Sequence, residues 1–319
     1  MNVDLTSPIF HDETAAREHL EAARWPNGPY CPHCGSFNAH RMGGETHREA
    51  LLYCRDCRKQ FSVTVGTVFE RSHVPLHKWM LANYLMNASK KGISAHQLSR
   101  TIDVTYKTAW FMCHRIREAM TDETAPPIGG EGKVVEADEM YIGRSELQAP
   151  SVHRQGRPYL KRTMKTQKRP VVALVERGGA ARAFHMGQRV TGKNLREKVM
   201  PHADRKSRLH TDESSLYDSV GYDFFVHESV HHGRGEYARG KGDDLVTTNS
   251  VEGFFGIIKR GMVGIYQHCG EQHLQRYLNE FAFRYTHRVK CGYSDTDRAI
   301  IALKGSSGKR LTYRRINAA

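Results

Sequence analysis

Two pairs of closely spaced cysteines lie near the start of the chain. Cys31-Pro-His-Cys34 and Cys54-Arg-Asp-Cys57 both have the C-x-x-C spacing, and nineteen residues separate them. Such a turn presents two thiolates to one side of an ion, and Zn²⁺ takes four ligands tetrahedrally. The spacing therefore predicts one structural zinc ion held by Cys31, Cys34, Cys54 and Cys57, with no open coordination position for catalysis. A pair of redox motifs is the alternative interpretation.

Three acidic residues, far apart in the chain, form a second candidate set. Asp138 lies in an apolar strand pattern, Asp212 ends a short strand, and Glu252 lies on a predicted helix. In-line phosphoryl transfer uses two divalent ions about 4 Å apart, and Mg²⁺ prefers a few carboxylates that leave room for water and phosphate. Lys259, two helical turns after Glu252, is placed to contact a substrate phosphate. The structural alternative is a set of unrelated turn formers and solvated helix residues.

The first carboxylate of this set has acidic neighbours. Glu136 and Glu139 flank Asp138, and Glu213 follows Asp212. Side chains alternate along a strand, so Glu136 is predicted to share the face of Asp138 and Glu139 to lie on the opposite face.

Residues 93–109 resemble a helix-turn-helix. Ser94 and Thr105 are predicted to cap its two helices, and residues 102–104 form the turn. A recognition helix needs polar and basic side chains on its outer face to reach bases and phosphates. The predicted DNA contacts of the second helix are Tyr106, Lys107, Arg115 and Arg117. The alternative is an ordinary packed pair of helices.

The charge balance points to a polyanionic partner. Lys and Arg number 48 against 34 Asp and Glu, which gives a net charge of +14. Nucleic acid is the leading candidate. The segment from Ser151 to Pro170 is basic and contains no Asp or Glu, so we expect it to bind the DNA backbone unless it is a solvated loop. Its predicted contacts are Arg157, Lys161, Arg162, Lys165, Lys168 and Arg169.

The sequence predicts neither export nor membrane insertion. No stretch approaches the ~20 apolar residues of a membrane span, and charges are mixed through residues 1–24. We therefore expect a cytoplasmic, nucleoid-associated protein with reduced thiols. Cys113, Cys269 and Cys291 are scattered and are predicted to be ordinary thiols.

Hydrophobic periodicity and turn residues divide the chain. The predicted parts are an N-terminal helix (1–24), a zinc ribbon (25–70), a helical DNA-binding domain (71–122), a linker (123–132), a catalytic domain (133–303) with a basic insertion near 144–169, and a basic tail (304–319). The fold class is therefore α+β and multidomain. Within 133–303, three strands, a helix, a further strand and a helical region follow one another.

Taken together, these motifs resemble the DDE insertion-sequence transposases with an N-terminal zinc ribbon. The resemblance covers nearly the whole chain, from Trp25 to the helix near Arg288. It is carried by the two cysteine pairs, Tyr106-Lys-Thr-Ala-Trp110, Val135-Glu-Ala-Asp138-Glu139, Tyr141-Ile-Gly143, His210-Thr-Asp212 and Thr248-Asn249-Ser-Val-Glu252.

The resemblance implies a ribonuclease-H-like domain, a mixed five-stranded sheet flanked by helices. It also implies that Asp138 and Asp212 are the first two ligands of two catalytic Mg²⁺ or Mn²⁺ ions. The third ligand of the family is Glu or Asn, and this chain offers both Glu252 and Asn249. Glu252 is preferred because a charged oxygen binds Mg²⁺ better than an amide does. Lys259 matches the basic residue expected two turns later.

The resulting hypothesis is a DNA transposase. It would bind the terminal inverted repeats of its own element, cleave at each end to free a 3′-OH, and transfer that hydroxyl to target DNA. Because two ends must be paired, a homodimer or a larger synaptic complex is expected. The alternatives are a related metal-dependent nuclease that joins nothing, and a zinc-ribbon DNA-binding regulator with an inactive catalytic fold.

Overall fold

The chain forms two compact units. The computed structural model describes residues 4–44, 47, 49–143, 168–187 and 189–312. The first unit comprises residues 1–124, 264–267 and 279–319, and the second comprises 125–263 and 268–278. The chain therefore leaves the first unit, builds the second and returns to complete the first.

The zinc ribbon of the first unit is a three-stranded antiparallel sheet in the order β1-β2-β3. The strands are β1 (Ala39–Arg41), β2 (Leu52–Cys54) and β3 (Gln60–Phe61). Leu52 and Phe61 are opposite one another in the register and both are buried, so they form the apolar side of this small sheet.

Helices complete the first unit. They are α1 (Glu13–Arg24), α2 (Leu76–Ala88), α3 (Ala95–Thr101), α4 (Tyr106–Ala119) and α9 (Asp295–Lys304), with the short turns η1 (Pro8–Phe10) and η6 (Val289–Cys291). Apolar side chains of the ribbon and of these helices share one continuous core. The predicted caps are confirmed, because the Ser94 hydroxyl accepts from Gln97 N–H and the Thr105 hydroxyl accepts from Thr108 N–H.

The C-terminal segment belongs to this first unit. α9 packs against α2, and Asn83 donates a 2.9 Å hydrogen bond to the carbonyl of Ala299. Farther on, Gly308 N–H donates to the carbonyl of Gly66 at 2.8 Å. Residues 133–303 were predicted to form the catalytic domain, whereas residues 279–319 complete the core of the N-terminal unit. Buried Ala302 and Leu303 explain this return of the chain.

A five-stranded mixed sheet forms the centre of the second unit. Its strands are β4 (Val134–Ile142), β5 (Arg169–Glu176), β6 (Ala181–His185), β7 (Arg208–Thr211) and β8 (Val226–Ser229). Their order is β6-β5-β4-β7-β8. The β4–β5 and β5–β6 pairs are antiparallel, and the β4–β7 and β7–β8 pairs are parallel. This is the ribonuclease-H-like topology that the resemblance implied.

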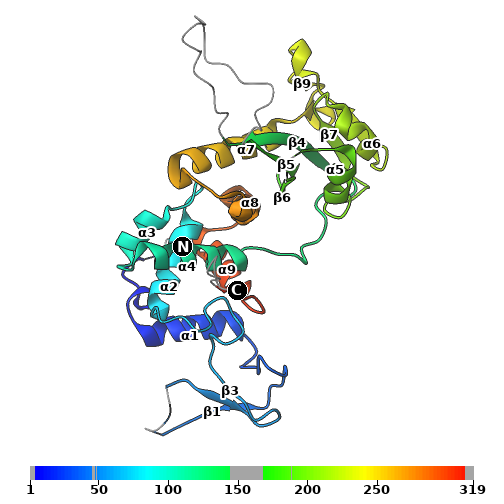
Figure 1. Ribbon diagram of the computed structural model, residues 1–319. Coiled ribbons are helices and arrows are strands. Elements are labelled where there is room, and N and C mark those ends of the chain that lie inside the picture. The colour runs from blue at the N-terminus through cyan, green and yellow to red at the C-terminus, as the bar shows by residue number, and fades with distance from the viewer. Residues whose placement is uncertain (1–3, 45–46, 48, 144–167, 188, 313–319) are drawn as a thin grey trace, which may run out of the picture. The chain divides into compact units, whose positions relative to one another are not determined.

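Helices cover both faces of this sheet. α7 (Asn249–Gly261) packs against β4 and β5 on one face, and α5 (Gly192–Val199) lies on the other (Figure 1). Leu195 and Val199 of α5 join Val135 and Ala137 of β4 in a buried cluster. The remaining helical turns are η2 (Ser215–Tyr217), α6 (Asp218–Gly221), η3 (His232–Arg234) and η4 (Gly242–Asp244).

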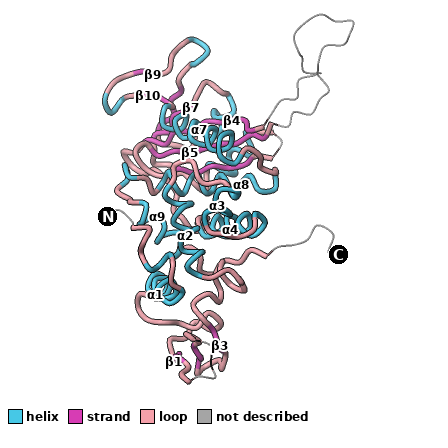
Figure 2. Tube along the Cα trace, turned by 90° about the vertical axis from the view of Figure 1, so that its left-hand side faces the viewer, coloured by secondary structure: helices cyan, strands magenta, loops and turns pink. Residues whose placement is uncertain are grey.

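Two elements cross the unit boundary, and one small hairpin extends from the sheet. The π-helix η5 (Met262–Tyr266) and α8 (Glu271–Thr286) each contribute residues to both units. The antiparallel strands β9 (Ala238–Arg239) and β10 (Val246–Thr247) form a hairpin that projects beyond the sheet (Figure 1 and Figure 2). Among the described residues, no helix is both long and apolar enough to cross a lipid bilayer.

Candidate zinc site and candidate active site

The four paired cysteines converge at the ribbon. The Sγ atoms of Cys31 and Cys57 are 3.6 Å apart, as are those of Cys34 and Cys54, and all four Sγ atoms lie within 4.8 Å of one another. A tetrahedral zinc ion with Zn–S bonds of about 2.3 Å requires thiolates separated by about 3.8 Å. The donor set and its spacing therefore fit a zinc ion. Among the described residues, the three other cysteines form no such group.

The end of β7 brings two aspartates together. β7 pairs with β4 only as far as Glu136 opposite His210, and β4 continues beyond that point paired to β5 alone. Asp212 follows the last residue of β7, so it occupies the space beside Asp138 that a longer β7 would have filled. Carboxylate oxygens of Asp138, Asp212 and Glu139 lie within 4.8 Å of one another.

Glu139 is a functional candidate that the sequence pattern did not indicate. It joins Asp138 and Asp212 in the group able to hold a metal ion, and its carboxylate accepts a 2.9 Å hydrogen bond from the hydroxyl of Tyr217. Tyr217 is buried in the cluster beneath α5, on the face opposite α7. Glu139 thus approaches the site from the opposite face of β4, as alternation predicts. At the edge where β7 ends, side chains from both faces reach the same space.

The electrostatics of this group match a cation site. Burial raises the pKa of Asp138 to about 7, and like charges on neighbouring carboxylates, including Glu252, act in the same direction. Burial also raises the pKa of Glu139 and of Asp212. Clustered carboxylates raise one another's pKa because like charges repel at short range. A divalent cation would relieve this repulsion.

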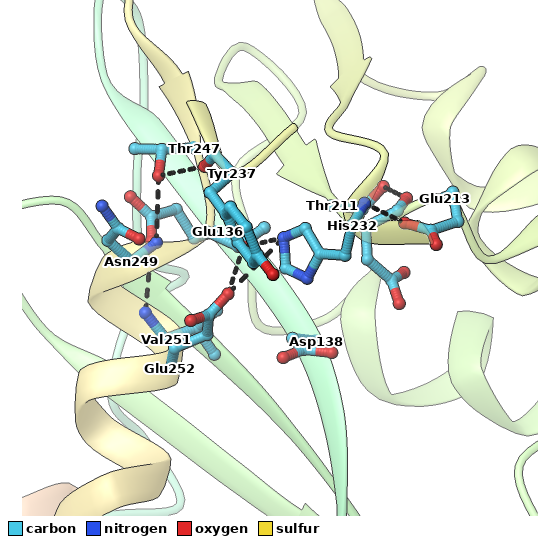
Figure 3. Close-up of polar contacts among 12 residues, drawn as sticks. Glu136, Asp138, Thr211, Glu213, His232, Tyr237, Thr247, Asn249, Val251 and Glu252 are labelled. Carbon is cyan, nitrogen blue, oxygen red and sulfur yellow. Dashed lines mark hydrogen bonds and ion pairs between the residues drawn. The ribbon is translucent and has the colours of Figure 1, made fainter. Parts of the chain in front are cut away.

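Glu252 lies in the first turn of α7, near Asp138 (Figure 3). It is not one of the residues whose oxygens lie within 4.8 Å of one another. Its carboxylate accepts a 2.9 Å hydrogen bond from the Thr248 hydroxyl and lies 3.6 Å from Nε2 of His232. Asn249 begins α7 and is exposed. The choice between Glu252 and Asn249 as third ligand stays a prediction, and the charge that Glu252 exerts on Asp138 favours Glu252.

Two further charged residues differ in exposure: Lys259 is open to solvent, whereas Glu136 is buried. Lys259 is exposed on α7, about 10 Å along the helix from Glu252 at 1.5 Å per residue. Glu136 is fully buried, and its carboxylate accepts hydrogen bonds from the N–H groups of Ser250 and Val251. Glu136 shares the face of Asp138, yet its oxygens are used by the start of α7.

The loop after β8 is tied to the edge of the site. The carboxylate of Glu213 accepts hydrogen bonds of 2.8 Å and 3.0 Å from the N–H groups of His232 and Gly233. These bonds hold the His232 ring beside Glu252, and the sequence pattern gave no indication of this arrangement.

The candidate DNA contacts of α4 divide into two groups. Tyr106 and Lys107 are exposed at its start, where the Tyr106 ring stacks on His96 with centroids 4.1 Å apart. Arg115 is 8% exposed and donates to the carbonyl of Glu70, and Arg117 is 2% exposed and is paired with Glu280 at 2.7 Å. Arg115 and Arg117 therefore have no surface to offer to DNA in this structure, because the C-terminal half of α4 lies inside the core of the first unit.

The basic stretch after β4 is only partly described. Arg157, Lys161, Arg162 and Lys165 lie outside the described residues. Lys168 is exposed just before β5, and Arg169 is paired with Glu271 at 2.7 Å. DNA contact by this stretch stays a prediction.

Comparisons with known proteins agree with this arrangement. Residues 129–286 match the family described as the ISXO2-like transposase domain, and residues 11–60 match the transposase zinc-ribbon domain. A protein of transposable element ISH50 from Halobacterium salinarum is 32% identical over 281 residues, which cover 86% of this chain and 91% of that protein.

Solved structures show only a distant likeness. The Mos1 strand transfer complex has a TM-score of 0.28 and 10% identity, covering 73% of this chain and 79% of that one. The mariner Mos1 paired-end complex with Mg has a TM-score of 0.25 and 8% identity over 69% of this chain and 75% of that one. Scores this low add nothing to the topology described above.

Proposed function

Because the chain belongs to the DDE insertion-sequence transposases with an N-terminal zinc ribbon, we propose that it binds the terminal inverted repeats of its own element and catalyses metal-dependent strand cleavage and strand transfer. The observation that carries the proposal is the convergence of Asp138, Glu139 and Asp212 where β7 ends, with Glu252 close enough for its charge to act on Asp138.

The side chains at this edge have the chemistry that phosphoryl transfer needs. Asp138, Glu139, Asp212 and Glu252 would hold two Mg²⁺ or Mn²⁺ ions. Such a pair of ions, when bound, supplies Lewis-acid stabilisation of both the attacking and the leaving oxygen. The Tyr217 hydroxyl orients Glu139, and the Thr248 hydroxyl orients Glu252. Positioning of this kind contributes to the rate because the reacting groups must be aligned before bonds change.

Two successive displacements account for the proposed reaction. In the first, the oxygen of water forms a bond to the phosphorus at the element end, and the bond to the 3′-oxygen breaks, which leaves a 3′-OH. In the second, that hydroxyl attacks a phosphodiester of target DNA and displaces its 3′-oxygen. No covalent protein intermediate is required, and the exposed Lys259 is the proposed contact to a phosphate nearby.

The first unit is proposed to recognise the element ends. The net charge of +14 favours a polyanionic partner. Tyr106 and Lys107 at the exposed start of α4 are the proposed contacts of the helix-turn-helix, with Lys168 a proposed backbone contact in the second unit. Pairing of two ends by one protein requires at least two copies, so a homodimer or larger assembly is proposed.

The decisive experiment uses the full chain, with zinc bound, and DNA carrying both ends of the element and its flanks. In Mg²⁺ we expect nicks that leave a 3′-OH at each element end, and joined products when a target plasmid is added. Asp138→Asn and Asp212→Asn should abolish both products while end binding, measured by gel shift, is retained. Cleavage without joining, even from pre-cut ends, would instead indicate a nuclease. Equal cleavage by Asp138→Asn would refute the assigned site.

A further inference from the structure

The first turn of α7 is held by a side chain from another element. A helix begins with N–H groups that have no partner within the helix, and a residue just before it usually caps them. Thr248, which precedes α7, makes no such side-chain cap. Instead Glu136 on β4 accepts from Ser250 N–H at 2.6 Å, Val251 N–H at 3.1 Å and the Ser250 hydroxyl at 3.0 Å.

Arg177 completes this arrangement from the turn between β5 and β6. Its Nε donates to the carboxylate of Glu136 at 3.0 Å, and its Nη atoms donate to the carbonyls of Leu245 and Thr247 at 2.8 Å and 3.3 Å. Nη2 also lies 3.2 Å from Nδ1 of His210. A single guanidinium thus joins Glu136 to the segment that leads directly into α7.

The carboxylate of Glu136 is fully buried. Taking a charged group out of water is costly unless it is paired and hydrogen-bonded. The hydrogen bonds given above join the Glu136 carboxylate to Arg177 and to the start of α7. They therefore hold the first turn of α7 against β4. An apolar pair could pack α7 on β4 without that desolvation cost, so packing alone does not explain why a carboxylate stands at position 136.

The position of this contact relates it to the active site. Glu136 and Asp138 are two residues apart on the same face of β4, about 6.6 Å along the strand. Glu252 is two residues after Ser250 in the same helical turn. The hydrogen bonds from Ser250 and Val251 to Glu136 therefore fix the position of Glu252 relative to Asp138, because they join the first turn of α7 to β4 (Figure 3).

We propose that Glu136, with Arg177, is a positioning residue that sets the distance between Glu252 and the aspartates, and hence the affinity of the site for divalent metal. The inference rests on the proposed function, since it assumes that Glu252 is a metal ligand. Glu136 itself touches neither metal nor DNA in this scheme.

The test measures metal binding directly and does not depend on turnover. Mn²⁺ binding by the full, zinc-loaded chain is followed by electron paramagnetic resonance for wild type, Glu136→Gln and Glu280→Gln. The control replaces another fully buried, ion-paired carboxylate, which lies in the first unit. We expect Glu136→Gln to weaken Mn²⁺ binding about tenfold, as loss of an outer contact to a metal ligand commonly does. Glu280→Gln should leave Mn²⁺ affinity unchanged, although it lowers the melting temperature.

A second measurement separates positioning from general destabilisation. Hydrogen exchange should accelerate at the Ser250 and Val251 amides of Glu136→Gln, and not in Glu280→Gln. If Glu136→Gln does not fold, Ser250→Ala removes one of the same hydrogen bonds and should weaken Mn²⁺ binding by a smaller factor. Wild-type Mn²⁺ affinity in a folded Glu136→Gln or in Ser250→Ala would overturn the positioning role alone. Absence of Mn²⁺ binding in the wild type would instead refute the proposed metal site.

Discussion

Replacing Asp138 by asparagine should make the metal-free protein more stable. Folding raises the pKa of this carboxyl from 3.8 to about 7, so at alkaline pH its charge costs the folded state up to about 4 kcal/mol at 1.36 kcal/mol per unit. The side chain keeps some exposure to solvent, which reduces the cost, and we expect a gain of roughly 1–3 kcal/mol for Asp138→Asn. Asparagine retains the oxygen that accepts the hydrogen bond from Glu139 N–H.

The difference in folding stability between wild type and Asp138→Asn should depend on pH. The raised pKa means that the folded protein holds a proton on Asp138 that the unfolded chain has already lost. The cost is therefore absent below about pH 4, grows as the pH rises, and is complete above about pH 7. Wild type and Asp138→Asn should have similar stability at pH 4 and should diverge towards pH 8.

The assay is thermal or urea unfolding between pH 4 and pH 8.5, in buffer freed of Mg²⁺ by a resin that leaves the ribbon's zinc in place. For a unit of this size, 1 kcal/mol corresponds to about 2–4 °C in Tm. Asp243→Asn, which alters an exposed carboxylate on η4, is the matched control and should change little. Added Mg²⁺ should stabilise wild type and not Asp138→Asn. A metal-free Asp138→Asn that is less stable than wild type at pH 8 would refute the reasoning.

Three further predictions concern the first unit. Cys54→Ser should abolish stoichiometric zinc binding, measured by atomic absorption, and unfold the ribbon; retained zinc would exclude the proposed ligand set. Glu280→Gln should cost about 3–5 kcal/mol in urea unfolding, because it leaves Arg117 buried without its anionic partner. The pKa of Glu280 is lowered to about 2, so its stabilisation is present above pH 4.5 and is lost as the pH falls towards 2; a loss near neutral pH would contradict this. Gly92→Ala should destabilise strongly, because Gly92 has φ +92° and an added Cβ would overlap the Tyr266 hydroxyl; an unchanged Tm would contradict the packing.

Local patterns predicted the parts of the structure that depend on neighbouring residues. The caps at Ser94 and Thr105 followed from side chains that reach their own helix, and the apolar strand pattern around Asp138 predicted β4. The mixed five-stranded sheet flanked by helices was implied by the family resemblance, and the structure has it. The cysteine spacing predicted a four-thiolate group that the fold brings together.

The surroundings of several site residues could not be predicted from local patterns, because they depend on segments far away in the sequence. Arg117 looked like an outward-facing basic residue because its partner, Glu280, lies 163 residues farther along the chain. Glu139 was placed on the opposite face correctly, yet its access to Asp212 depends on where β7 stops, which alternation cannot reveal. Alternation placed Glu136 on the face of Asp138, but it could not show that the N–H groups at the start of α7 occupy the oxygens of Glu136.

The return of residues 279–319 to the first unit has a consequence for how the protein is made and lost. Ribosomal synthesis makes α9 after α2 and after the whole of the second unit, so the core of the first unit is completed only once the second unit has been synthesised. A frameshift or stop codon after α7 would consequently leave an N-terminal fragment whose core lacks Phe283, Ala302 and Leu303. Such a truncated chain should unfold and be degraded more readily than the intact protein.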